Sequence, residues 1–515
     1  MDASEKSKIR AAIAALGALT VVFAVAGIAG RDFGRHWDEG RIFRPAHEAI
    51  LSGSLIPHAH AYPAFAFDVY LASLAPTVLL DGRAAAAELA LAPDHRLRVR
   101  ALFVLLTACA IPWAFWAARA AGADRGAALF AAGAMALSFE LSYHSRWVVT
   151  DAVAMQFGAL CLALALHALA RPDERRWIVL AGAAAGLAAA TKYNAGIVIL
   201  TPMAAILATP SLAPAERLRR AASVGFAAAL VFLLVSPGTA IEWRAFLAQA
   251  RQESAHYASG HGGHSVAPGL EHAGRIVVYL ATQLFSPWMP AAIALFGASL
   301  LGLVRLVRER PRAAAVLLVA ALVYLAFMST RAVMIVRNLL LVAPVLAVGL
   351  AFGLSSGLEI LARLAPRPPL GRAALRGAVV ALGLAQAAFL VHAGRDTAAF
   401  DETQMLDRFL AGIAGTPERP IHVSRQIRML ASEGRSQLPA HARHAEADAD
   451  DHAILMSEVV RILNAWPANV PGRYESFGPA DVNFDYYPDW TGRDRVVLVP
   501  EEAWARLRGA LKGPR

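Results

Sequence analysis

The chain has 515 residues, of which 57% are hydrophobic and only 17% are charged. This composition excludes an ordinary soluble protein, which carries a larger share of charged residues, and it favours a membrane protein. The formal net charge of +10 does not indicate nucleic-acid binding, because much of the basic charge lies in short segments between apolar runs, where it sets membrane orientation.

The first apolar stretch, residues 11–30, follows three basic residues and is long enough to cross a bilayer. A signal peptide would have a shorter apolar core, so we interpret this stretch as an uncleaved span. Later apolar runs bring the expected number of transmembrane helices to about eleven. They are residues 99–118, 127–141, 152–170, 177–190, 195–208, 218–235, 276–304, 313–328, 333–354 and 373–391. Pro287 and Pro290 break the run 276–304, which fits an interfacial helix followed by a span.

Residues 65–80 are apolar, but the run is short and contains Asp68. If this segment crossed the membrane, every later loop would change sides. We expect it to be an interfacial or re-entrant helix within one long outer loop, residues 31–98, because the arginines then segregate as the positive-inside rule requires. The cytoplasmic loops then contain Arg119, Arg125, Arg171, Arg175, Arg176, Arg217, Arg219, Arg220, Arg305, Arg308, Arg310, Arg312, Arg363, Arg367, Arg372 and Arg376, and the opposite short loops only Arg146, Lys192, Arg331 and Arg337.

The composition shifts after the last apolar run. Residues 394–515 are polar, mixed in charge and without a span, and they are numerous enough for a small soluble domain. Runs at 420–424, 453–460 and 495–500 predict strands, and 424–432 and 501–511 predict helices. We therefore expect a transmembrane domain at 1–393 and an extracytoplasmic α/β domain at 394–515.

Ionisable residues at membrane level are costly and tend to mark function. The first outer loop contains Arg35-His36-Trp37-Asp38-Glu39, shortly after the first span. Two adjacent carboxylates can supply a general base and an anchor for a metal or a hydrogen bond. A solvated loop or a helix cap would use the same residues, so both interpretations stay open.

Two more polar places follow on the same side. Ser145-Arg146 and Thr150-Asp151 stand at the outer end of a span, where a helix N-cap is the alternative reading. Lys192 stands in a polar break between two apolar runs, on the side where positive charge is scarce. It suggests an anionic partner, although a lysine that extends its amine to the membrane surface from a tight turn would look the same.

Arg337-Asn338 lies inside the apolar run that continues to Pro344, with Arg331 shortly before it. An arginine in such a place needs an anion, and a phosphate is a natural candidate, as is a carboxylate of another helix. The glycine-rich stretch from His256 to His272, which includes His261 and His264, lacks the spacing of a defined zinc motif, so a loop that covers a cavity is the preferred interpretation.

In this order, the pieces resemble the GT-C fold glycosyltransferases of family 39 and their bacterial relatives, which include protein O-mannosyltransferases and the lipid A aminoarabinose transferase. The resemblance covers roughly residues 10–354. Its pieces are Trp37-Asp38-Glu39, Gly53, Tyr62-Pro63, Ser145-Arg146, Thr150-Asp151, Gly182–Gly186, Thr191-Lys192, Arg337-Asn338 and Pro344. The family often has tyrosine where this chain has Asn338.

The resemblance implies a polyprenyl-phosphate sugar as donor, an outward-facing active site and a catalytic aspartate in the first outer loop. Asp38 matches that aspartate and Asp151 the second family acid, with Glu39 in support. The expected substrate contacts are Lys192, Arg337, Arg146, Tyr62 and His36, the first two toward the donor phosphate. Some enzymes of this class use a divalent cation, Mg²⁺ or Mn²⁺, which Asp38 and Asp151 would hold here.

The expected function is sugar transfer to a lipid, glycan or protein acceptor at the outer face of a bacterial cytoplasmic membrane. A transporter or flippase of an anionic or lipid-linked substrate is the alternative, but the spans show no two related halves and the charged residues gather at one face. A scaffold whose outer tail binds a partner would leave Asp38, Asp151, Lys192 and Arg337 unexplained. The sequence identifies neither the sugar nor the acceptor.

Overall fold

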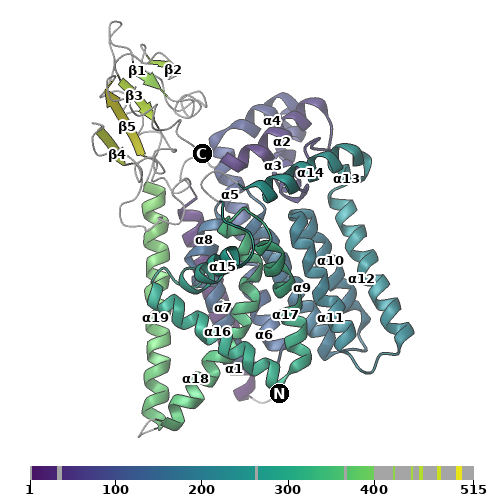
Figure 1. Ribbon diagram of the computed structural model, residues 1–515, viewed down its shortest axis with the longest axis vertical. Helices are drawn as coiled ribbons and strands as arrows, with labels where there is room; N and C mark the ends of the chain where they lie inside the picture. The colour runs from purple at the N-terminus through teal and green to yellow at the C-terminus, as the bar shows by residue number, and fades with distance from the viewer. Residues whose placement is uncertain are drawn as a thin grey trace. The chain divides into compact units, whose positions relative to one another are not determined.

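The computed structural model describes residues 3–31, 37–260, 265–364 and 368–399, and five short strands between residues 421 and 500. Contacts divide the chain into two compact units. One contains Met1–Ile28 and Trp37–His392, and the other contains Ala29–His36 and Ala393–Arg515. The described elements of the first unit are all helices (Figure 1).

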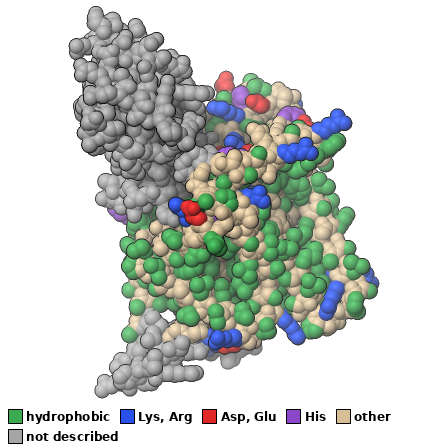
Figure 2. All heavy atoms as spheres, viewed as in Figure 1, with side chains coloured by type: hydrophobic (Ala, Val, Ile, Leu, Met, Phe, Trp, Pro, Cys, Tyr) green, Lys and Arg blue, Asp and Glu red, His purple; other side chains and the backbone are tan. Residues whose placement is uncertain are grey.

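Seven helical segments among the described residues are long and apolar enough to cross a membrane. The chain is therefore a multi-span membrane protein, and hydrophobic side chains cover most of the visible face of its helical unit (Figure 2). The seven are α1 (Ala3–Ala29), the α5–α6 pair (Pro93–Ala108 and Ala110–Ala120), α9 (Asp151–Ala170), α12 (Pro214–Val235), α16 (Met289–Glu309), α17 (Pro311–Ser329) and the η3–α18 pair (Val336–Val342 and Ala343–Leu364).

Helices occupy all eleven predicted positions, but seven or eight of them qualify as spans. The eighth is the pair α7 (Arg125–Leu137) and α8 (Phe139–Ser145), which bends by 52°. The other three positions hold helices that do not qualify as spans. They are α10 (Arg175–Thr191), η2 with α11 (Tyr193–Ile199 and Leu200–Ala208), and the apolar part of α19 (Pro368–Ala399).

Two details of the helix pattern agree with the prediction. The segment Phe65–Leu80 forms one helix, α3, which packs with α2 (Gly40–Ser52) and α4 (Gly82–Leu91). The run 276–304 is divided between α15 (Leu270–Thr282) and α16, which begins beside Pro290. The chain between the two helices thus holds the predicted break.

Helices α10 and α12 pack closely because glycine leaves room for a neighbouring backbone. A Cβ atom on Gly182 would lie 2.6 Å from the carbonyl oxygen of Val224, and one on Gly186 would lie 2.4 Å from that of Ala228. Small residues at such spacing let membrane helices approach backbone to backbone. The Gly182–Gly186 pair thus has a packing role. The contact fixes α10 against α12, and Lys192 directly follows α10.

The arginine-rich loops meet at one end of the helical unit. Residues 120–121, 170, 172, 209–211 and 309–313 line one cavity of about 600 Å³. Arg310 donates to the carbonyl of Ala121, and Arg175 pairs with Glu216. Four of the five loops that were predicted to share the cytoplasmic side are thus brought together, and the loop with Arg363, Arg367, Arg372 and Arg376 stays a prediction.

The second unit contributes a five-stranded sheet with the order β2-β1-β3-β5-β4. β1 pairs in parallel with β2 and β3, whereas β5 pairs antiparallel with β3 and β4. The strands are β1 (Ile421–Val423), β2 (Ala442–His444), β3 (His452–Leu455), β4 (Arg473–Ser476) and β5 (Arg495–Pro500). Both helices predicted in this region lie outside the described residues, so an α/β domain remains a prediction, and His261 and His264 also lie outside them.

Candidate active site

The predicted site residues stand where helices begin or end. Asp38 belongs to the short helix η1 (Trp37–Glu39), Asp151 opens α9, and Lys192 follows α10. Arg337 and Asn338 belong to η3, the 3₁₀ segment that begins the span formed by η3 and α18. Such ends leave polar backbone groups unpaired within the helix, so polar side chains and water gather there.

Helix capping does not explain the two aspartates. Thr150, the cap residue of α9, makes no side-chain capping hydrogen bond, and neither does Glu39 at the start of α2. The carboxylates of Asp38 and Asp151 pair with cationic side chains instead. The N-terminus of α9 adds a favourable field for the Asp151 charge.

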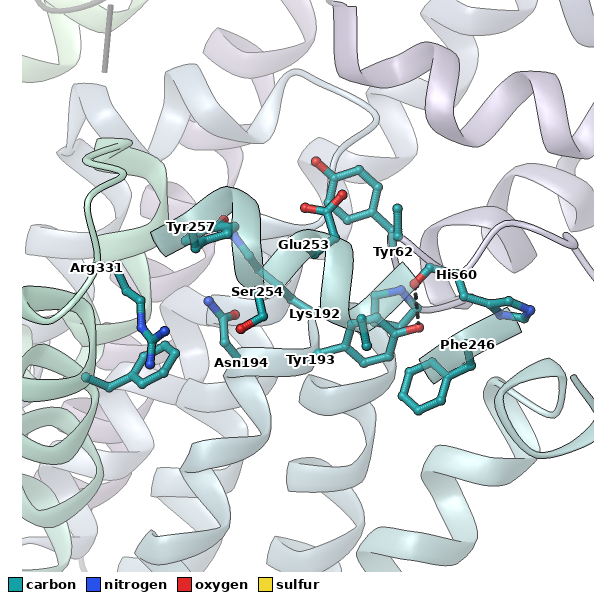
Figure 3. A pocket seen from close by; sticks show the side chains of 14 residues that line it. His60, Tyr62, Lys192, Tyr193, Asn194, Phe246, Glu253, Ser254, Tyr257 and Arg331 are labelled. Atoms are coloured by element: carbon teal, nitrogen blue, oxygen red, sulfur yellow. Dashed lines mark hydrogen bonds between the residues drawn. The ribbon is translucent and has the colours of Figure 1, made fainter. Parts of the chain in front are cut away.

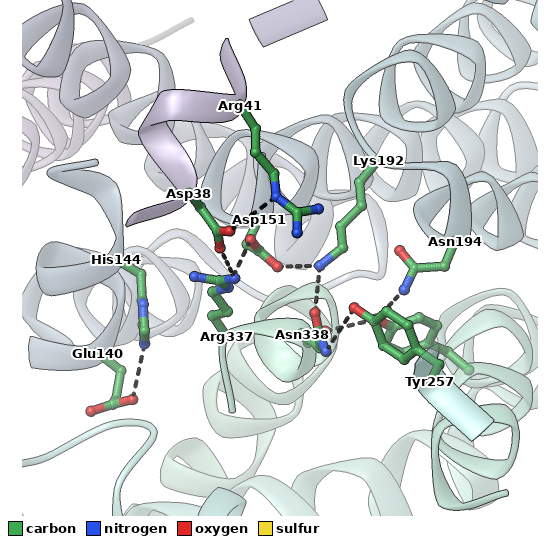
Figure 4. A network of polar contacts seen from close by, with 11 residues as sticks. Asp38, Arg41, Glu140, His144, Asp151, Lys192, Asn194, Tyr257, Arg337 and Asn338 are labelled. Atoms are coloured by element: carbon green, nitrogen blue, oxygen red, sulfur yellow. Dashed lines mark hydrogen bonds and ion pairs between the residues drawn. The ribbon is translucent and has the colours of Figure 1, made fainter. Parts of the chain in front are cut away.

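Arg337 joins the two acids, which are 113 positions apart in the sequence. Its Nη2 donates a hydrogen bond to Asp38, and its Nε lies 3.3 Å from Oδ2 of Asp151 (Figure 4). All three side chains are nearly buried, with exposed fractions of 7% for Arg337, 11% for Asp38 and 4% for Asp151. A buried guanidinium of this kind needs its counter-ions, so the contact fixes both carboxylates in place.

Lys192 completes the cluster from the other side of Asp151. Its ammonium group donates to the Asp151 carboxylate and to the side-chain oxygen of Asn338. The amide nitrogen of Asn338 is 3.4 Å from the hydroxyl of Tyr257, and its backbone carbonyl accepts from Tyr324 at 2.8 Å. Asp38, Asp151, Arg337 and Lys192 thus form a neutral set of two anions and two cations, called the ion cluster below.

Glu39 has a different position from its neighbour. Both of its carboxylate oxygens accept from Arg100, at 2.8 Å and 2.7 Å, and one also accepts from the backbone nitrogen of Val148 at 3.0 Å. Glu39 and Arg100 are completely buried. The pair ties η1 to α5 and to the chain before α9, so it positions Asp38, and it does not line the cavity described next.

A cavity of about 320 Å³ adjoins the ion cluster (Figure 3). Lys192 lines it, and Tyr62, Tyr193 and Tyr257 supply aromatic rings to its wall. Burial, together with the nearby Asp38, raises the pKa of the Tyr62 hydroxyl well above its ordinary value, so the phenol stays neutral. Rings and neutral hydroxyls of this kind suit a sugar, which has apolar C–H faces and many hydroxyls.

Helix α14 (Trp243–Ser259) lines the cavity, and only its residues from 256 on belong to the stretch that was predicted to cover one. Its Glu253 pairs with Arg41 at 3.3 Å, and Arg41 lies 3.8 Å from Asp38. Arg41 also covers the Tyr62 ring, 5.7 Å from its centroid. The polar, mixed-charge sequence of α14 resembles a solvated surface helix, so nothing in it before residue 256 indicated a cavity wall.

The remaining predicted contacts differ in outcome. Tyr62 and Lys192 line the cavity, whereas Arg146 does not. Arg146 is fully buried, 3.5 Å from the hydroxyl of Ser142 and one residue before the buried Trp147. His36 lies outside the described residues.

The two aspartates do not form a ready site for a divalent cation. Asp38 already faces Arg337, and the two oxygens of Asp151 face Lys192 and Arg337. A metal ion between these carboxylates would have to displace a buried guanidinium. Among the described residues there is also no group of three or more histidine, cysteine or acidic side chains arranged to hold a metal.

Comparisons with known proteins point to one class of enzyme. The family model of dolichyl-phosphate-mannose-protein mannosyltransferase matches residues 65–249. A search of curated proteins found no match. The structure of ArnT from Cupriavidus metallidurans in the apo state has a TM-score of 0.51 at 16% identity, covering 98% of this chain and 100% of ArnT.

Two further solved structures are similar. ArnT from the same organism bound to undecaprenyl phosphate has a TM-score of 0.50 at 16% identity, covering 96% of this chain and 98% of ArnT. The Archaeoglobus fulgidus oligosaccharyltransferase in complex with Zn and sulfate gives 0.48 at 11% identity, covering 90% and 72%. The chain thus shares its fold with ArnT, and its residues 65–249 match the model of a mannosyltransferase family.

Proposed function

We propose that the chain transfers a sugar from a polyprenyl-phosphate sugar to an acceptor at the outer face of a bacterial cytoplasmic membrane. The supporting observation is the ion cluster, in which Asp38 and Asp151 share Arg337 beside a cavity with an aromatic wall. The similarity to ArnT, whose structure holds undecaprenyl phosphate, supports the class of donor.

The reaction we propose is a single displacement. An acceptor hydroxyl attacks the anomeric carbon, the bond from that carbon to the phosphate oxygen breaks, and polyprenyl phosphate leaves with the bonding electrons. Asp38 orients the hydroxyl and takes its proton. Because attack and departure occur on opposite faces, the anomeric configuration inverts.

The cations of the ion cluster have two tasks in this proposal. Before reaction they hold Asp38 and Asp151 ionised and in place. As the phosphate leaves, its negative charge grows, and Lys192 and Arg337 stabilise that charge in a site largely closed to water. Tyr62 contacts the substrate from the cavity wall, and Glu39 supports Asp38 through Arg100.

A divalent cation is not needed for this chemistry, because Arg337 and Lys192 already neutralise the two carboxylates. Transfer by the purified protein should therefore persist in EDTA. Loss of transfer in EDTA and its return with Mg²⁺ or Mn²⁺ would contradict this and show that the reaction requires the ion.

Mass spectrometry of envelope glycans tests the function and identifies its substrates. Deletion of the gene should remove one sugar from a lipid, glycan or protein of the envelope, and the wild-type gene should restore it. The gene for Asp38→Asn should not restore it, although its product should accumulate in the membrane. Unchanged glycans after deletion, with an anionic lipid retained on the inner leaflet, would favour the flippase.

A further inference from the structure

The donor phosphate needs a cation that is not already neutralised. Adding Arg41 and Glu253 to the ion cluster gives three carboxylates and three cations, so the extended cluster has no surplus positive charge. Three charged side chains line the cavity, namely Lys192, Glu253 and Arg331. Lys192 pairs with Asp151 and Glu253 pairs with Arg41, which leaves Arg331 as the cation to consider.

Arg331 has no ion-pair partner among the residues that the structure describes. Its Nε is buried there without a hydrogen-bond partner, and its guanidinium lies over the ring of Phe327, 4.5 Å from the ring centroid. A buried guanidinium nitrogen without a partner is costly unless a ligand supplies the acceptor. The planar fork of arginine matches two oxygens of a phosphate.

The backbone around Arg331 is held from three sides. Its own N–H donates to the carbonyl of Met328 at 2.9 Å, and Nδ1 of His272 lies 2.6 Å from its carbonyl oxygen. The next residue, Ala332, donates to the carbonyl of Tyr257 at 2.9 Å, which ties this loop to α14. The backbone that carries the Arg331 side chain is therefore fixed, which lowers the entropy cost of binding a ligand there.

The position of Arg331 in the chain suits a lipid headgroup. Helix α17, a membrane span, ends at Ser329, so Arg331 lies just beyond the apolar part of the fold. Phe327 lines the cavity beside it and belongs to the last turn of that span. A polyprenyl chain in the bilayer would bring its phosphate to this depth.

We propose that Arg331 binds the phosphate of the polyprenyl donor, a role that the sequence motifs assigned to Lys192 and Arg337. This inference rests on the proposed function. In it Arg331 supplies the affinity for the phosphate of the bound donor, while Lys192 and Arg337 organise the carboxylates and stabilise the charge that grows on the phosphate as it leaves. Arg331 is a binding residue for the same site and carries no proton in the reaction.

The test is competition for bound fluorescent undecaprenyl phosphate on the full-length protein in detergent. The competitors are unlabelled undecaprenyl phosphate, undecaprenol, inorganic phosphate and phosphatidylglycerol. Arg331→Ala should weaken undecaprenyl phosphate binding roughly 10- to 100-fold, as expected for loss of a charge-assisted contact, and leave undecaprenol binding unchanged. Arg331→Lys should retain part of the affinity because it keeps the charge without the fork.

Arg275→Ala is the matched control, because Arg275 is 64% exposed, pairs with Glu271 and does not line the cavity. It should bind like the wild type. Wild-type affinity in both Arg331→Ala and Arg331→Lys would overturn the assignment, as would equal competition by phosphatidylglycerol or by inorganic phosphate. If thermal melting shows that Arg331→Ala does not fold, the affinities of Arg331→Lys and Arg331→Gln for undecaprenyl phosphate are compared instead. Wild-type affinity in both of these variants would overturn the assignment.

The wild-type protein separates this inference from the function on which it rests. If the wild type binds undecaprenol as well as undecaprenyl phosphate and releases no sugar from a donor, the proposed function fails. If the wild type discriminates and transfers but the Arg331 variants do the same, only the role of Arg331 fails.

Discussion

Adjacent residues Asp38 and Glu39 have opposite surroundings, although the sequence presents them as a pair. Asp38 faces Arg337 beside the cavity, whereas Glu39 is enclosed by Arg100 and the backbone of Val148. One carboxylate is thus available to the chemistry and the other holds the loop. The sequence indicated that this dipeptide matters, but only the fold separates the two roles, because Arg100 lies inside a predicted span.

Glu39→Gln should reduce stability strongly. Removing one partner of a completely buried ion pair leaves a charge without compensation and costs about 3–5 kcal/mol. Thermal melting in detergent should show the loss, and activity per folded molecule should fall less than in Asp38→Asn, because Glu39 positions Asp38 without lining the cavity. The double variant Glu39→Met with Arg100→Met should recover much of the stability, and a catalytic role for Glu39 would instead appear as inactivity of this well-folded protein.

At the level of single elements, glycine spacing decides how closely helices approach. Gly186→Ala should destabilise the protein, because the new Cβ would lie 2.4 Å from the carbonyl oxygen of Ala228. The matched control is Gly225→Ala in α12, where nothing lies within 4 Å of the new atom. That change should be neutral or stabilising by up to about 1 kcal/mol, since alanine is the better helix former. Equal melting temperatures for the two variants would contradict the close contact.

The loop before α3 is fastened to the chain before α14 by Glu242. His58 and His60 bind its two carboxylate oxygens at 2.5 Å and 2.8 Å. Burial by itself would raise the pKa of the Glu242 carboxyl, but the hydrogen bonds from His60 and His58 outweigh it and lower the pKa below the ordinary 4.5. A lowered pKa in the fold stabilises the protein above pH 4.5, and this stabilisation is lost as the pH falls through the lowered value.

Glu242→Gln should accordingly lower the melting temperature by a few degrees at pH 7, and the difference from the wild type should shrink below pH 4.5. Thermal melting from pH 3.5 to pH 7.5 measures the effect, with Glu271→Gln on the exposed face of α15 as the control. A difference that is constant over the whole range would mean that the Glu242 carboxylate does not hold the loop.

Across the whole molecule, helix positions were predictable from apolar runs, and the end at which the arginine-rich loops meet was predictable from their charge. The sequence did not reveal which short helices span or that α14 closes the cavity, because these depend on packing between segments far apart in the chain. The meeting of Asp38 and Asp151 was predictable through a resemblance, whereas Arg337 as their common partner required the fold.

Sidedness is a property of the entire helical unit and can be measured directly. The 20 residues of α9 separate Asp151 from the arginine-rich end by about 30 Å. With Cys109 and Cys161 replaced, a membrane-impermeant maleimide applied to spheroplasts should label Leu55→Cys but not Ser211→Cys, two exposed positions. Labelling of Ser211→Cys alone would place the ion cluster in the cytoplasm and reject the proposed orientation.

Measuring the release of polyprenyl phosphate tests most directly whether the protein uses its ion cluster to transfer sugar from a lipid donor. The purified protein is mixed with membranes from a strain that lacks the gene, which supply donor and acceptor, and the lipids are followed by mass spectrometry. The wild type should convert a polyprenyl-phosphate sugar to polyprenyl phosphate, and Asp38→Asn, equally well folded, should do so about 10²- to 10⁴-fold more slowly. Equal rates for the two proteins, or no donor consumed by either, would contradict the role of Asp38 and the function built on it.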